Sequence, residues 1–136
     1  MRLKSIVVCD DVRQEIGNKL TLVGAYNEAI VFPAGEGGLG LPKLAVVFVV
    51  SGLRGVAQID YRHFLHFGDG PLLEPTMTPI QRPPAQDEQN FVLLESPLVL
   101  PGPGRLRAVL DVRVEGETER YEYAFEVRRL APSTAH

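Results

Sequence analysis

The sequence predicts an all-β protein, a single antiparallel β-sandwich of the immunoglobulin-like or a similar kind, with seven to nine strands. Apolar residues recur at every second position far more often than at every third or fourth, which is the period of a strand. The 13 glycines and 11 prolines fall mainly between these segments, as turn residues of a sandwich do. No segment has an apolar stripe at helical spacing. A length of 136 residues favours one domain over residues 1–136.

The expected strands follow one another along the chain. The second and third of them are nearly continuous, so that they form either one bent strand or a tight hairpin. The strand at 43–51 reads KLAVVFVVS and is apolar on both faces. In chain order, the expected strands cover residues 3–9, 20–26, 28–32, 43–51, 56–67, 90–95, 106–114 and 120–128.

The last two expected strands form a hairpin, because both alternate apolar with charged residues and Gly116 lies between them. Charge pairing across the hairpin predicts its register. A four-residue loop at 116–119 places Glu115 opposite Arg120 and Arg113 opposite Glu122, whereas a two-residue loop at 116–117 places like charges opposite each other. We therefore predict the four-residue loop.

Composition narrows the class of protein. A net charge of -3 and a pI near 5.6 give no overall attraction to nucleic acid or anionic lipid. Cys9 is the only cysteine, so no intramolecular disulfide can form. The apolar runs are too short for a signal peptide or a membrane-spanning helix. We expect a soluble cytoplasmic protein that binds neither membrane nor nucleic acid.

A long proline-rich loop is expected at residues 68–89, with five prolines. Loops beyond roughly 12–15 residues in a compact domain are usually functional or disordered. This loop is one candidate for covering the second apolar face of the strand at 43–51, and another subunit is the other candidate. The candidate interface residues are Leu44, Val46, Val47, Phe48 and Val49.

The stretch CDDVR at residues 9–13 is interpreted as a structural corner formed by Cys9, Asp10, Asp11 and Arg13. Asp11 and Gln14 have the spacing of a capping box, which predicts a short helical turn. A buried salt bridge from Arg13 to Asp10 or Asp11 is a structural variant of the same corner. The two acids next to Cys9 raise the pKa of its thiol, which disfavours a nucleophilic role.

Other chemical sites are not supported by the spacing of the residues that they need. His63 and His66 are three apart, so that in a continuous strand they point to opposite faces and cannot bind one metal ion. The arginines near the C-terminus alternate with acidic residues, which indicates a salt-bridged surface. We assign no catalytic, cofactor-binding or metal-binding residue and expect no cofactor.

The N-terminal residues carry a resemblance to a known group of proteins. The chain is similar to a family of small, uncharacterised bacterial proteins whose sequences begin with an apolar strand, Cys-Asp-Asp-Val-Arg, Gly-Lys and Leu-x-Leu-x-Gly-x-Tyr. This resemblance implies a bacterial intracellular origin and no catalytic residue. It departs at Asn18, which separates Gly17 from Lys19. The matching residues are Cys9, Asp10, Asp11, Val12, Arg13, Lys19, Leu20, Leu22, Gly24 and Tyr26.

These observations favour a non-enzymatic binding or assembly module that self-associates or docks a protein partner. It would use the apolar strand at 43–51 and the loop at 68–89. One alternative is a metal-binding protein or hydrolase in which Asp10 and Asp11 meet Asp69 or His63. A second alternative is a small-ligand carrier with a pocket between the sheets.

Overall fold

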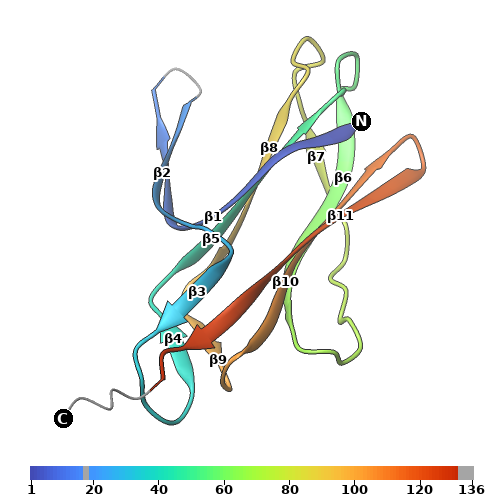
Figure 1. The fold of residues 1–136 in the computed structure, drawn as a ribbon. Helices are drawn as coiled ribbons and strands as arrows, with labels where there is room; N and C mark the ends of the chain where they lie inside the picture. The colour runs from blue at the N-terminus through green and yellow to red at the C-terminus, as the bar shows by residue number, and fades with distance from the viewer. Residues whose placement is uncertain (17–18, 132–136) are drawn as a thin grey trace, which may run out of the picture.

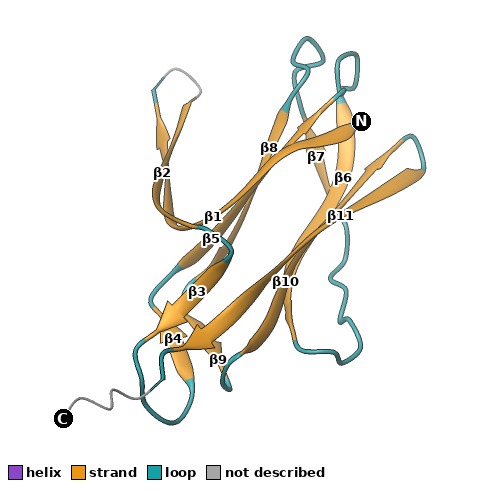
Figure 2. Ribbon diagram, viewed as in Figure 1, coloured by secondary structure: helices purple, strands orange, loops and turns teal. Residues whose placement is uncertain are grey.

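The computed structural model describes residues 1–16 and 19–131, which form a two-layer β-sandwich (Figures 1 and 2). The all-β prediction is confirmed. Within the described residues there are eleven strands and no helix, so none that could span a membrane. The strands are β1 (Arg2–Glu15), β2 (Lys19–Tyr26), β3 (Ala29–Phe32), β4 (Leu39–Leu41), β5 (Leu44–Ser51), β6 (Gln58–Phe67), β7 (Thr78–Gln81), β8 (Gln89–Glu95), β9 (Leu98–Leu100), β10 (Gly104–Val114) and β11 (Glu117–Arg129).

The prediction of seven to nine strands was too low, because β4, β7 and β9 were not expected. Each has only three or four residues, and each lies in or beside a segment rich in glycine or proline. The expected loop at 68–89 therefore contains a strand, β7, which pairs with β6. Short edge strands of this kind have too few residues to show an alternating pattern.

The strands form two main sheets. Sheet A has the order β2-β1-β5-β8, and sheet B has the order β3-β11-β10-β6-β7. β4 and β9 form a separate two-stranded pair. Strand pairs are antiparallel except for β3, which runs parallel to β11. The nearly continuous segments at 20–26 and 28–32 are thus neither one strand nor a hairpin, because β2 belongs to sheet A and β3 to sheet B.

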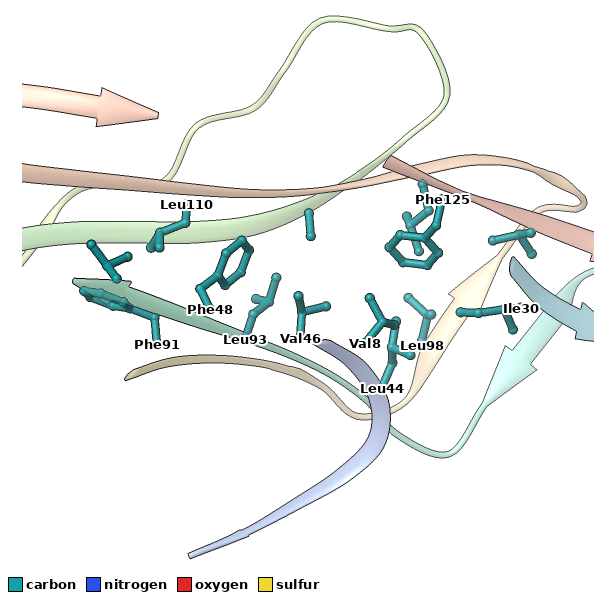
Figure 3. Close-up of a cluster of buried hydrophobic side chains, with 14 of the residues drawn as sticks. Val8, Ile30, Leu44, Val46, Phe48, Phe91, Leu93, Leu98, Leu110 and Phe125 are labelled. Carbon is teal, nitrogen blue, oxygen red and sulfur yellow. The ribbon is translucent and has the colours of Figure 1, made fainter. Parts of the chain in front are cut away.

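The core lies between sheets A and B. From β5, the side chains of Leu44, Val46 and Phe48 point into it and are at most 1% exposed. They meet Leu110 and Phe125 from sheet B (Figure 3). Burial of these large apolar side chains is the main source of stability in a domain of this size.

The C-terminal hairpin has a different register from the one predicted. The loop is Glu115 and Gly116 alone, and Asp111 lies opposite Arg120. Both loop residues have positive φ, 51° and 83°, as in the type I′ turn that matches the twist of two-residue hairpins. The prediction of a four-residue loop was wrong because it considered only charge pairs and omitted turn geometry.

A segment that we call the strap, residues 68–77, joins β6 to β7 and is tied to the outer face of sheet B. Its Glu74 binds Arg120 of β11 at 2.6 Å and Arg62 of β6 at 3.2 Å. Both arginines also bind Asp111 of β10. The expected salt-bridged face on sheet B is therefore present, and the strap forms part of it.

Arg82 organises the connection between β7 and β8. Its side chain is buried and donates hydrogen bonds to backbone carbonyl groups on two separate loops. These carbonyl groups belong to Leu53 and Val56 on one loop and to Gln86 on the other. The planar guanidinium group can satisfy several acceptors at once. Arg82 thus positions the chain that leads into β8.

Candidate functional site

The CDDVR stretch lies within β1, at a bend where the strand turns away from β5 (Figure 1). The predicted helical turn was wrong, because β1 continues to Glu15. At the bend Cys9 pairs with Ala25 and Asp11 with Val23, whereas Asp10 and Gly24 between them are not paired.

The bend requires a glycine opposite Asp10. Gly24 has a φ of 67°, and a Cβ atom at this position would lie 2.4 Å from Oδ2 of Asp10. The hydroxyl group of Tyr26 donates a hydrogen bond to the same carboxylate. The Gly-x-Tyr spacing at residues 24–26 is therefore explained by the backbone conformation of this bend.

The acids of the bend are already bound by neighbouring groups. Nζ of Lys43 lies 3.3 Å from Oδ1 of Asp11. The Val12 amide and the Lys43 ammonium group lower the pKa of Asp11. Burial and the hydrogen bond to Asp10 raise the pKa of Tyr26 to about 12.

The other two residues of the expected corner take different positions. Cys9 is fully buried, and burial is the main reason why the pKa of its thiol is raised. A thiol in this state is a poor nucleophile. Arg13 is exposed beyond the bend and lies opposite Thr21. The predicted salt bridge from a buried Arg13 is not present in the described residues, and Lys43 binds Asp11 instead.

The residues considered for a metal or hydrolytic site do not converge. His63 is on β6 in sheet B, with its ring 5.3 Å from the ring of Tyr61. Asp69 is exposed on the strap. In residues 1–16 and 19–131, no group of three or more histidine, cysteine or acidic side chains is arranged to hold a metal ion. Asp10 and Asp11 therefore have no further ligands in that part of the chain.

The five expected interface residues do not form an exposed surface. Leu44, Val46 and Phe48 are in the core. Val47 points to the outer face of sheet A but is only 3% exposed, and Val49 beside it is half-buried. The exposed apolar surface expected here is therefore absent, because three of the five side chains fill the core and Val47 is almost fully buried.

Beyond the bend, residues 11–15 of β1 and 19–23 of β2 form a hairpin that we call the arm (Figure 1). The arm and β8 enclose a cleft of about 660 Å³ on the outer side of sheet A. Gln14 and Leu20 line the cleft from the arm, and Asn90 and Val92 line it from β8. The cleft therefore lies between β2 and β8, the two edge strands of sheet A.

The cleft is mainly polar, with amide groups, the charged side chains of Lys19, Arg54, Asp87 and Glu88, and few apolar residues. Gln14, Gln86, Gln89 and Asn90 supply amide groups that can donate and accept hydrogen bonds. On the arm, Leu22 lies opposite Val12, two pairs from the Leu20 and Gln14 pair and therefore on the same face. Leu22 is 37% exposed. The arm thus presents apolar side chains toward the outer side of sheet A.

Three of the four edges of sheets A and B carry features that oppose pairing with another strand. β3 and β7 have four residues each, and Pro79 lies within β7. β2 carries Lys19 and the bend at Gly24. Short length, proline, lysine and local bends are the usual means of protecting a sheet edge.

β8 lacks these features. It has seven residues, QNFVLLE, with no proline, lysine or arginine, and it pairs with β5 without a register shift. No strand lies on its other side in the part of the chain that the structure describes. Because Phe91 and Leu93 point into the core, Asn90, Val92 and Leu94 point outward. Leu94 is 50% exposed.

A comparison with protein-family models finds no family that matches the chain, and a comparison with curated proteins finds no match either. The strand at 90–95 was expected from the sequence, but its position at the edge of sheet A was not. The available signal was the lack of charge over residues 89–94, which distinguishes β8 from the charged strands at the C-terminus.

Proposed function

We propose that this protein is a non-enzymatic docking module that accepts an extended strand at the free edge of β8, beside the arm. The observation that carries the proposal is the unprotected β8 edge, where half-exposed Leu94 lies on the same face as the cleft-lining Val92. A free edge presents a row of backbone N–H and C=O groups, which is the surface used in strand addition.

The cleft supports the same mode of binding. In strand addition, backbone hydrogen bonds supply affinity and alternate side chains of the bound strand supply specificity. Outward side chains of an added strand would reach the cleft and contact Leu20 and Val92. Gln89 and Asn90 would supply polar contacts at the end of the cleft. The single buried cysteine supports a cytoplasmic location for this module.

A peptide titration tests the proposal. A synthetic peptide with the sequence of residues 89–95 is added to the ¹⁵N-labelled full chain, and amide chemical shifts are recorded by NMR. We expect saturable shifts along β8 and at Leu20, because the added strand pairs with β8 beside the arm. A peptide with proline in place of the residue matching Leu93 is the control, since proline removes a donor and does not fit a central strand.

Two variants of the full chain locate the binding surface. Leu94→Lys places a charge on the exposed face of β8 and should abolish the shifts. Val99→Lys is the matched control, because Val99 is 72% exposed on β9, beyond the end of β8 and outside the residues that would pair. If Leu94→Lys binds the peptide as well as the unchanged chain does, the proposed site is wrong.

A further inference from the structure

We infer that the strand accepted by β8 is β8 of a second copy of this chain, paired antiparallel about a twofold axis. The inference rests on the proposed docking function and names its partner. The two four-stranded A sheets would then form one continuous sheet across the dimer. The arm of each copy would flank the joined strands.

Charge supports a second copy as the partner. Residues 89–94 are uncharged, and Glu95 at the end of β8 is its only charged residue. Like charges directly opposite each other destabilise an antiparallel pair. When β8 pairs with itself near its centre, Glu95 lies opposite an uncharged residue. Self-pairing of β8 is therefore free of repulsion between like charges.

The pattern of exposed apolar residues selects one register. With Leu93 on the twofold axis, Leu94 lies opposite the partner's Val92, and Glu95 lies opposite the partner's Phe91. Both outward apolar residues of each β8 then pair with apolar residues of the partner. Cross-strand pairs of this kind are the unit of sheet stabilisation.

The neighbouring registers make poorer pairs. With Val92 on the axis, Leu94 lies opposite the partner's Asn90. With Leu94 on the axis, Val92 lies opposite the partner's Ser96. Each of these registers keeps the outward faces together, but each leaves an apolar side chain against a polar one.

The cleft and the symmetry of the contact support the same partner. The cleft lies over the outer face of β8 between Leu20 and Val92, where the partner's Leu94 would enter. A β8-to-β8 contact is isologous and closes as a dimer, whereas a β2-to-β8 contact would repeat without closing. Lys19 and the bend at Gly24 make β2 the poorer edge for such a repeat.

Sedimentation of the full chain tests for the second copy. We expect a dimer at micromolar concentration, with Leu94→Lys shifted to monomer because it places two lysines next to the axis. Val99→Lys should sediment as the unchanged dimer. A chain that is monomeric throughout this range overturns the inference.

Disulfide cross-linking tests the register. The variants Val92→Cys and Leu94→Cys are mixed and oxidised, and the unchanged chain is the control because Cys9 is fully buried. We expect heterodimers of the two variants to exceed both homodimers, since residues 92 and 94 face each other across the axis. A dominant homodimer of either variant overturns the register.

The two proposals can fail separately. A monomeric chain that still binds the peptide of residues 89–95 retains the docking function and excludes the second copy as its partner. A chain that neither dimerises nor binds the peptide overturns both. In the NMR titration the peptide is added in large excess over the chain, so that it outcompetes self-association.

Discussion

Asp111 shows how a single buried polar residue connects several parts of this molecule. Its side chain is 1% exposed and accepts hydrogen bonds from Arg62 on β6 and Arg120 on β11, at 2.6 to 2.8 Å. Both arginines also hold Glu74 of the strap. A buried carboxylate is tolerated only when such partners compensate for the loss of water.

The pKa of Asp111 predicts a loss of stability in acid. Burial raises this pKa, but the hydrogen bonds from Arg120 and Arg62 outweigh burial, so that it lies below its usual value. A lowered carboxyl pKa contributes stability that is present above the unfolded-state pKa of about 3.9 and is lost as the pH falls through the folded-state pKa. We expect the free energy of unfolding to decrease below about pH 4.

Urea unfolding of Asp111→Asn at several pH values measures this contribution. We expect a loss of about 3–5 kcal/mol at neutral pH, because two arginines lose their buried partner, and a weaker dependence on acid pH. Asp60→Asn is the control and should cost less than about 1 kcal/mol, since its pair with Arg113 is more exposed. Equal stability of Asp111→Asn and the unchanged chain would contradict the assigned role.

Gly24→Ala tests the explanation of the bend. We expect a loss of about 1–3 kcal/mol from the positive φ alone, and a further loss because Asp10 must move away from Tyr26. Adding Asp10→Ala to this variant should recover part of the stability by removing the clash. Gly116→Ala is the control for backbone strain, since a Cβ atom there has no neighbour within 4 Å. Thermal unfolding compares the four proteins, and a Gly24→Ala cost no greater than that of Gly116→Ala would contradict the explanation.

At the scale of elements, turn geometry and edge position decide what each strand can do. Two registers of the β10–β11 hairpin were compared from the sequence, and the observed register differs from both by an even number of residues. All three registers therefore keep the apolar side chains of the two strands on the same face. The two-residue turn selects among them. The composition of β8 is similar to that of other apolar strands. Its backbone N–H and C=O groups are free to pair only because β8 lies at the edge of sheet A.

The turn at Glu115 and Gly116 predicts a stabilising substitution. Glu115 has a φ of 51°, a conformation that costs most residues about 1–2 kcal/mol but that asparagine adopts readily. Glu115→Asn creates the favoured Asn-Gly pair. We expect the free energy of unfolding to rise by about 0.5–1 kcal/mol, measured by urea unfolding with Glu117→Asn as the control. An unchanged or lower value would contradict a type I′ turn.

At the scale of the whole molecule, some surfaces are covered by the chain itself and others are free to contact a partner. The strap is tied across the outer face of sheet B, and the core between the sheets is filled by apolar side chains. The outer side of sheet A carries the cleft, the arm and the free edge of β8. Strand order therefore leaves the free backbone edge of β8 in the same sheet as the arm and the cleft.

Dimerisation through β8 predicts that thermal stability depends on protein concentration. A partner that binds only the folded chain stabilises it by mass action. We expect the melting temperature to rise with concentration for the unchanged chain and for Val99→Lys, measured by differential scanning calorimetry. The melting temperature of Leu94→Lys should be independent of concentration. Concentration independence of the unchanged chain would contradict the dimer.

The sequence by itself determined the all-β class and the approximate positions of eight strands, because these follow from the alternation of neighbouring residues. The tertiary structure alone decided three features: the ion pair of Lys43 with Asp11, the contact of Gly24 with Asp10, and the free edge of β8. Each of these brings together residues that are distant in the chain or depends on which strand lies beside which. Strand order and backbone bends result from the packing of all the strands together, and a local pattern of residues does not record that packing.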